Sequence, residues 1–121
     1  MDKNILVVDD SATVRKLVAT TLQLSGFTVV TACDGMDALE KIPVYECDLV
    51  ITDLNMPNID GLELIRTLRE TEEYRELPVI VLSSLSDEEN SVELTKHGIK
   101  AYIQKPFDKQ KILTQVSKFI N

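Results

Sequence analysis

The stretch Ile5-Leu-Val-Val-Asp-Asp10 sets the pattern of this sequence, because four apolar residues run directly into two carboxylates. A short, continuous apolar run is typical of a strand that is covered on both faces of a sheet. Four more strand candidates follow, several of them rich in Val and Ile: 28–31, 49–52, 79–82 and 101–103. The sequence therefore predicts five short strands.

The first two segments between these runs have helical periodicity. From Val14 to Leu22 the apolar residues, Leu17 among them, fall on one helical face, and Gly26 follows as a stop signal. A short helix is predicted over 35–42, ended by Pro43, because the proline nitrogen has no hydrogen to donate.

Three further helices complete the alternation. Asp60 and Asp108 stand where N-cap residues begin two of them, and a third is predicted over 88–97. That third helix has a thin apolar stripe of Val92 and Leu94, so it can shift at low cost. Five β-α units of about 24 residues suit parallel strands joined by right-handed crossovers. The predicted fold is thus α/β and doubly wound, and such folds bind ligands outside the carboxyl ends of their strands.

Length and composition exclude several classes of protein. The 121 residues suit one domain over 1–121. A net charge of −7 argues against a nucleic-acid binder, which needs a basic face. No apolar run approaches the ~20 residues that span a bilayer, and the first residues do not resemble a signal peptide. Because Cys33 and Cys47 show no metal-type spacing, we expect small packed thiols in a reducing cytoplasm. From the net charge and the lack of a long apolar run, we expect no contact with nucleic acid or membrane.

Polar residues follow four of the five predicted strands. Asp9 and Asp10 come after the first strand, Asp53 after the third, Ser83 after the fourth, and Lys105 two residues after the fifth. If these ends share one edge of the sheet, they place three carboxylates, a hydroxyl and an ammonium group in one crevice.

Such a crevice needs a cation. Two carboxylates ~5 Å apart repel by about 3 kcal/mol at an effective dielectric constant of 20, and three remain net negative even beside Lys105. Hard oxygen ligands with incomplete protein coordination favour Mg²⁺, which binds best when phosphate oxygens complete its shell. A metal beside a free lysine suits phosphoryl transfer, with Asp53 as the nucleophile. The residues predict a phosphoryl acceptor.

Each of these residues also has an ordinary interpretation. An aspartate after a strand often caps the next helix, as Asp10 or Ser11 could, and Lys105 could be a solvated surface charge. His97, the only histidine, stands in the last turn of a helix, where a cation favours the helix dipole. It is the coincidence of four polar strand ends at one edge that favours a site.

Four motifs resemble those of response-regulator receiver domains. They are Ile5-Leu-Val-Val-Asp-Asp10, Val50-Ile-Thr-Asp53-Leu-Asn-Met-Pro-Asn-Ile-Asp-Gly61, Ser83-Ser84 and Lys105-Pro-Phe107, in the family's order and spacing over the whole chain. The segments 11–15 and 55–64 are most similar to single-domain chemotaxis regulators of the CheY type. The resemblance implies a flavodoxin-like receiver fold, with five helices around a five-stranded parallel sheet of order 2-1-3-4-5.

The resemblance also implies roles at the site. Asp53 would be the phosphoacceptor, and Lys105 would contact the phosphoryl group. Asp10 and Asp53 would bind Mg²⁺ directly, Asp9 through water, and the backbone carbonyl of Asn55 would supply a further ligand.

A second set of implied roles concerns switching. The Ser83 hydroxyl would donate to a phosphoryl oxygen, Tyr102 would then swing inward, and the bond before Pro106 would be cis. Asn55 and Leu85 would tune the lifetime of the phosphoryl group. Since Leu85 offers no polar group to orient an attacking water, we expect slower self-dephosphorylation than in a Leu85→Glu variant.

The implied function is a switch rather than a turnover enzyme, with intrinsic self-phosphorylation and self-dephosphorylation. A sensor histidine kinase would donate the phosphoryl group, and the face of the fourth helix, fifth strand and fifth helix would change shape for a partner. That partner would be a flagellar motor switch protein in chemotaxis, or a histidine phosphotransfer protein if the chain is a phosphorelay intermediate. A phosphatase is a further expected partner, and we expect a monomer.

Two other functions share the fold class. A flavin-binding electron carrier needs a Ser/Thr/Gly-rich loop for the flavin phosphate, which Asp9 and Asp10 would repel. An aspartyl-phosphate phosphohydrolase resembles an Asp-x-Asp pattern after the first strand, which Asp9-Asp10-Ser11 lacks. It also needs a cap region, for which 121 residues leave little space.

Overall fold

The computed structural model describes residues 3–84 and 91–120, and over these residues it confirms the predicted fold class. One parallel sheet has the order β2-β1-β3-β4-β5. Its strands are β1 (Asn4–Val8), β2 (Thr28–Ala32), β3 (Leu49–Asp53), β4 (Val79–Ser83) and β5 (Ala101–Gln104). Each observed strand contains the predicted apolar run and extends it by one residue.

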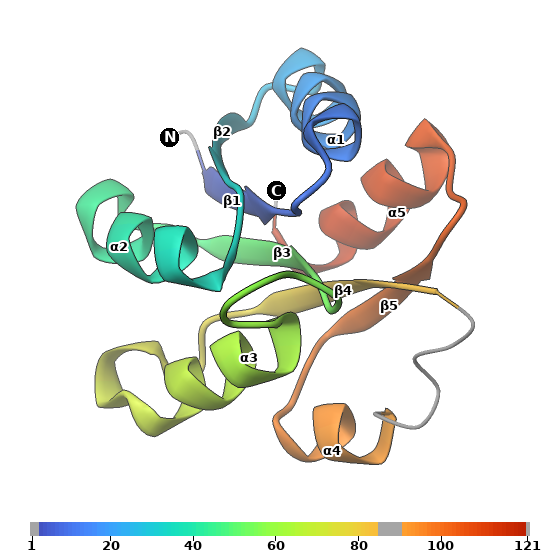
Figure 1. The fold of residues 1–121 in the computed structure, drawn as a ribbon. Helices are drawn as coiled ribbons and strands as arrows, with labels where there is room; N and C mark the ends of the chain where they lie inside the picture. The colour runs from blue at the N-terminus through green and yellow to red at the C-terminus, as the bar shows by residue number, and fades with distance from the viewer. Residues whose placement is uncertain (1–2, 85–90, 121) are drawn as a thin grey trace.

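Helices cover both faces of the sheet (Figure 1). They are α1 (Ala12–Leu24), α2 (Gly35–Tyr45), α3 (Gly61–Glu70), α4 (Ser91–Lys96) and α5 (Lys109–Phe119), with a short 3₁₀ helix η1 (Glu72–Tyr74) after α3. The side chains of Ser11, Asp34, Asp60 and Asp108 accept a backbone N–H in the first turn of α1, α2, α3 and α5. These caps fix where each helix leaves the carboxyl edge of the sheet.

The core consists of two layers, because successive side chains of a strand point to opposite faces. Ile5 and Val7 of β1 pack with α1 and α5, whereas Leu6 and Val8 pack with α2, α3 and α4. Burying a side chain of this size stabilises the fold by about 1.5–3 kcal/mol. The sheet is therefore held on both faces, and its strand ends are rigid supports for a site.

Two helix predictions were wrong in detail. Helix α2 continues through Pro43 to Tyr45 and ends at Glu46, whose φ of 49° is left-handed. The missing N–H of Pro43 removes one i→i−4 hydrogen bond, which does not end the helix, and two helical residues follow. In α1, Leu17 is 37% exposed, because Val18 and Leu22 occupy the centre of the buried face.

Helix α4 is described only from Ser91 onward, so the first residues of the predicted helix lie outside the described residues. Of its predicted stripe, Leu94 is fully buried and Val92 is 69% exposed. Within residues 3–84 and 91–120, no helix has the length and apolar character that crossing a bilayer requires.

Candidate functional site

The register of the strands brings the predicted site residues to one edge of the sheet. Val8 of β1 is paired with Thr52 of β3, so the next residues along the two strands are Asp9 and Asp53. Asp53 in turn is paired with Leu82 of β4, whose next residue is Ser83. Parallel pairing alone therefore places these polar groups at neighbouring positions of the carboxyl edge.

Three carboxylates meet at this edge. Oxygen atoms of Asp9, Asp10 and Asp53 all lie within 4.8 Å of one another. Asp9 and Asp53 are buried, with 0% and 5% of their surface exposed, whereas Asp10 faces solvent. Asp9 and Asp53 thus form the wall of the site and Asp10 lies at its rim, so a ligand can approach the site from solvent.

Lys105 supplies the positive charge of the site. Its Nζ lies 3.2 Å from Asp9 Oδ2 and 3.3 Å from Asp53 Oδ1. The position of the lysine is fixed by its backbone, because its N–H donates to the carbonyl of Ser83 at 2.7 Å. The bond from Lys105 to Pro106 is cis. One ammonium group thus bridges two buried carboxylates and leaves a net negative charge.

Burial and charge both act on the Asp53 carboxyl group. Burial raises its pKa, and the neighbouring charge of Asp9 raises it further. Lys105 and the backbone N–H of Asn55 act in the opposite direction without cancelling the rise. For Lys105, burial lowers the pKa, but the charges of Asp53 and Asp9 outweigh it and the net pKa is raised. The site therefore holds a protonated lysine beside a carboxylate that a second cation would stabilise.

The loop after β3 rests on glycine at two positions that the sequence did not single out. A Cβ on Gly61 would lie 2.2 Å from the carbonyl oxygen of Asp53, and one on Gly35 would lie 2.7 Å from Ile59. The N–H of Gly61 donates to the carbonyl of Leu54 at 2.9 Å. The start of α3 thus packs directly on the backbone that carries Asp53, and no larger residue fits between them.

Arg15 and Ser11 also support the site. Arg15 Nη1 donates to the carbonyl oxygen of Asp9 at 2.5 Å, and the N–H of Ser11 donates to Asp9 Oδ1 at 2.9 Å. Ser11 was correctly placed as a helix cap. Arg15 had no predicted role, because nothing in the spacing shows that a side chain from α1 reaches back to β1.

The two predicted switch residues lie on the same face of the sheet. Side chains alternate between the two faces along a strand, so Ser83 points to the same face as Val81. Tyr102 points to the face opposite Ala101 and Ile103. Both side chains therefore point toward the layer of α4. Ser83 is 8% exposed and Tyr102 is 39% exposed. Burial raises the pKa of the Tyr102 hydroxyl, opposed by its hydrogen bond with Thr95 of α4. Tyr102 thus connects β5 to the helix beside it.

The remaining predicted residues are less informative. Asn55 is exposed beside the site, and Leu85 lies outside the described residues. The expectation of two packed thiols was wrong for Cys33, which is exposed at the end of β2, while Cys47 is partly buried before β3. A residue directly after a strand on the outer edge of the sheet has little covering it, which explains the exposure of Cys33.

The donor set fits a hard divalent cation. Ligand oxygens of one Mg²⁺ ion lie about 3–4 Å apart, since each bond is about 2.1 Å long. One ligand oxygen from each of the three carboxylates already lies within 4.8 Å of the others, close to this range. The acids outnumber the single lysine, which gives the electrostatic reason for a cation at the site.

Comparison with known proteins supports the same fold and shows the family. Residues 5–117 match the family described as "Response regulator receiver domain". Chemotaxis protein CheY-3 of Vibrio cholerae is 37% identical over 110 residues, 88% of this chain and 85% of that protein. Hybrid signal transduction histidine kinase D of Dictyostelium discoideum is 33% identical over 112 residues, which are 93% of this chain but only 7% of the kinase.

Solved structures agree with these sequence relatives. The structure of the Vibrio cholerae chemotaxis protein CheY4 superposes with a TM-score of 0.92 at 32% identity, over 99% of this chain and all of that one. A response regulator receiver protein from Pseudomonas putida has a TM-score of 0.89 at 35% identity, over 98% of both chains.

Proposed function

We propose that this chain, which belongs to the response regulator receiver domain family, is a two-component signalling switch set by phosphorylation of Asp53. The observation that carries the proposal is the Lys105 ammonium group, which lies within 3.3 Å of the Asp9 and Asp53 carboxylates while Asp10 stands beside them. This arrangement offers a nucleophile, a cation for the phosphoryl oxygens and ligands for a metal at one strand edge.

The proposed reaction is a transfer between two side chains. A carboxylate oxygen of Asp53 attacks the phosphorus of a phosphohistidine on a kinase, so a P–O bond forms while the P–N bond breaks and the imidazole takes up a proton. Lys105 then holds the phosphoryl oxygens by charge. A Mg²⁺ ion bound by Asp10 and Asp53, with Asp9 and the carbonyl of Asn55 beside it, would offset the negative charge of the transferred group.

We assign to Ser83 and Tyr102 the step that turns phosphorylation of Asp53 into a change of shape. The Ser83 hydroxyl donates to a phosphoryl oxygen and draws its loop inward, and Tyr102 swings from its partly exposed position into the space that is vacated. Helix α4 responds readily because, in the part of it that the structure describes, Leu94 is its one fully buried side chain. A partner that binds only the altered face of α4, β5 and α5 then reads the state.

The proposed output is control of the flagellar motor in chemotaxis, supported by the likeness to CheY-3 over most of both chains. The second candidate is a phosphorelay intermediate that passes its phosphoryl group to a histidine phosphotransfer protein. The likeness to a hybrid histidine kinase favours that alternative. Pull-down with and without beryllofluoride, against a flagellar switch protein and a histidine phosphotransfer domain, separates the two.

Incubation with acetyl phosphate followed by mass spectrometry tests the acceptor. We expect the mass increase of one phosphoryl group on Asp53, dependent on Mg²⁺ and abolished by chelator. The Asp53→Asn variant should gain nothing, whereas Glu63→Gln, which removes an exposed carboxylate in the first turn of α3, should be labelled normally. An adduct on another residue, or one indifferent to chelator, would contradict the proposal.

We assign the lifetime of the phosphoryl group on Asp53 in part to Leu85. Replacing it with glutamate supplies a polar group that orients water toward the phosphoryl group, so Leu85→Glu should lose phosphate faster than the wild type. A time course of labelled phosphate release in Mg²⁺ measures this, and equal rates would remove Leu85 from the proposal.

A further inference from the structure

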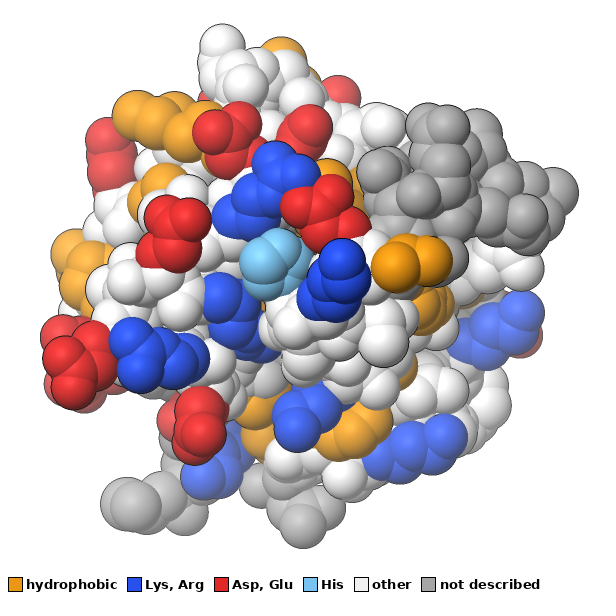
Figure 2. All heavy atoms as spheres, turned by 90° about the horizontal axis from the view of Figure 1, so that it is seen from below, with side chains coloured by type: hydrophobic (Ala, Val, Ile, Leu, Met, Phe, Trp, Pro, Cys, Tyr) orange, Lys and Arg blue, Asp and Glu red, His pale blue; other side chains and the backbone are white. Residues whose placement is uncertain are grey.

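A second charged region lies at the opposite, amino-terminal edge of the sheet. Here a hollow of about 570 Å³ opens between the last turn of α3, the segment after η1, the end of α4 and the loop into β5. Figure 2 shows Lys and Arg side chains gathered around the single histidine on this face. Besides Gly98, the hollow is lined by Arg69, Arg75, Glu76, Lys96, His97 and Lys100.

The charge of this hollow is opposite to that of the chain. Four cationic side chains and one carboxylate give the lining a charge of +3 with a neutral histidine, although the chain as a whole carries −7. The remainder therefore carries −10. A cationic hollow raises the local concentration of anions at this point of an otherwise acidic chain.

Helix dipoles account for only part of this cluster. Arg69, Lys96 and His97 stand at the ends of α3 and α4, where a cation offsets the partial negative charge of the helix terminus. Arg75 and Lys100 do not, since Arg75 follows a three-residue 3₁₀ helix and Lys100 is in a loop. Those two cations need another explanation.

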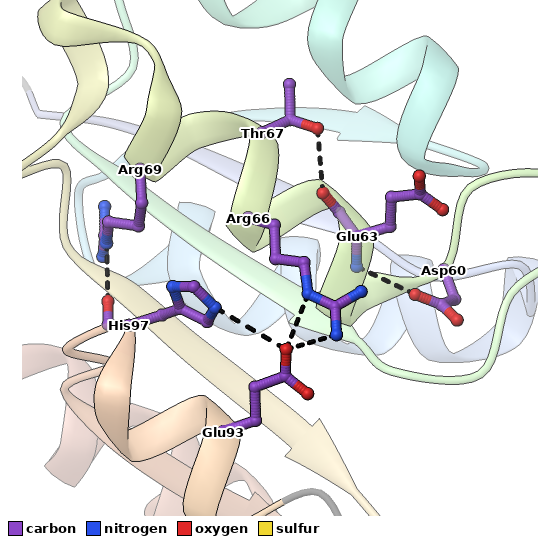
Figure 3. Close-up of polar contacts among 7 residues, drawn as sticks. All are labelled: Asp60, Glu63, Arg66, Thr67, Arg69, Glu93 and His97. Carbon is purple, nitrogen blue, oxygen red and sulfur yellow. Dashed lines mark hydrogen bonds and ion pairs between the residues drawn. The ribbon is translucent and has the colours of Figure 1, made fainter.

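Arg69 is fixed in the wall of the hollow by carbonyl groups. Its Nε donates to the carbonyl of His97 at 2.6 Å (Figure 3). Its Nη1 donates to the carbonyl of Tyr74 at 3.1 Å. Among the described residues it has no carboxylate partner, and burial lowers the pKa of its guanidinium group. The structure thus holds a half-buried cation in place and leaves its charge without an anion.

The rim of the hollow is braced separately. Arg66 of α3 donates through two nitrogens to Glu93 Oε1 of α4, and His97 Nε2 lies 3.9 Å from the same oxygen (Figure 3). Glu93 is therefore engaged by Arg66 and does not neutralise the four cations of the lining. The pair also links α3 to α4 across the rim of the hollow.

We infer that this hollow is a binding site for a polyphosphate group. The volume is within the range of small-molecule sites, about 300–1,000 Å³. A lining charge of +3 complements two or three linked phosphates, and a guanidinium fork matches phosphate oxygens in geometry. The lining residues include no Phe, Tyr or Trp, so recognition rests chiefly on the phosphates. Inorganic polyphosphate and nucleoside polyphosphates share this chemistry.

Titration of the ¹⁵N-labelled chain in metal-free buffer, followed by NMR, tests the site. The probes are sodium tripolyphosphate and a nucleoside triphosphate, against sodium chloride at matched ionic strength. We expect saturable shifts at residues 75–76 and 96–100 with a dissociation constant below about 1 mM. Equal affinity for the two probes assigns the site to phosphates alone, and tighter binding of the nucleotide shows that the organic group also contacts the wall.

Matched variants locate the binding. Arg75→Gln with Lys100→Gln removes two lining charges, while Lys111→Gln with Lys118→Gln removes two exposed charges of α5. The first pair should weaken tripolyphosphate binding by about tenfold and the second should change it little. Equal loss in both pairs, shifts centred on Asp9 and Asp53, or equally tight binding of a polyglutamate peptide would overturn the inference. The wild-type phosphorylation assay is independent of this result.

Discussion

The two edges of the sheet differ in charge and in construction. At the carboxyl edge, buried carboxylates follow the strands directly and one lysine bridges them. At the amino edge, cations come from helix ends and loops around an open hollow. The first edge is largely buried and has the donor set for a cation, whereas the second is exposed and has the charge for an anion. The two edges of one sheet can therefore suit ligands of opposite charge, because the edges themselves carry opposite charges and are built from different segments.

The largest expected difference between the edges concerns glycine. Gly61→Ala places a methyl group against the backbone of Asp53 and should lower the free energy of unfolding by about 3 kcal/mol or more. Gly98→Ala meets no atom within 4 Å and carries only the strain of its φ of 67°, about 1 kcal/mol. Urea denaturation measures both. Equal losses would show that the carboxyl edge is not the more tightly packed.

The two thiols also sit at opposite edges, and they should react at different rates. Burial and the charge of Asp48 raise the pKa of the Cys47 thiol to about 11, so about one in a thousand is thiolate at pH 8. Its labelling by a disulfide reagent should rise about tenfold per pH unit below that pKa, while exposed Cys33 reacts first. Labelling of the Cys33→Ser and Cys47→Ser variants separates the rates. A Cys47 that reacts as fast as Cys33 at pH 8 would contradict the burial.

Ligands should stabilise the chain independently at each edge. At ten times its dissociation constant, Mg²⁺ should add about 1.4 kcal/mol to the free energy of unfolding. Asp10→Asn should lose this gain, because it removes the exposed ligand, whereas Arg75→Gln with Lys100→Gln should keep it. Thermal melts with and without Mg²⁺ measure the difference. A Mg²⁺ response that survives in Asp10→Asn would place the ion elsewhere.

The smallest effect is expected for the ion pair at the rim of the hollow. Arg66 and Glu93 side chains are 45% and 38% exposed, so solvent screens their attraction. Glu93→Gln should shift the urea midpoint only slightly more than the control Glu70→Gln, and the difference should vanish in about 1 M salt. A difference that persists in salt would mean that the pair is more than a surface contact.

Sequence and structure agree best where the signal is local. The apolar runs, the caps at Ser11, Asp60 and Asp108, and the order of the sheet implied by the resemblance are confirmed. Cap residues and strand runs act over three to eight neighbouring positions, so their pattern is visible in the chain itself. Pro43 misled the prediction because the loss of one i→i−4 hydrogen bond need not end a helix.

Contacts between distant segments were invisible in the sequence. The reach of Arg15 to Asp9, the approach of Gly61 to Asp53 and the assembly of the basic hollow all join separate elements. Net charge is a sum over the chain, and it conceals a local excess of the opposite sign. The roles of Asp9, Asp10, Asp53, Ser83, Tyr102 and Lys105 remain proposals for the experiments above.

The amino-acid sequence by itself determined the alternation of strands and helices and the kinds of side chain at the strand ends, because hydrophobic period and capping are local. Only the tertiary structure decided that the Lys105 amine bridges Asp9 and Asp53, and that cations from α3, α4 and two loops share one hollow. Those outcomes depend on strand register and on which helix covers which face. Both are set by burying the apolar faces of all elements at once.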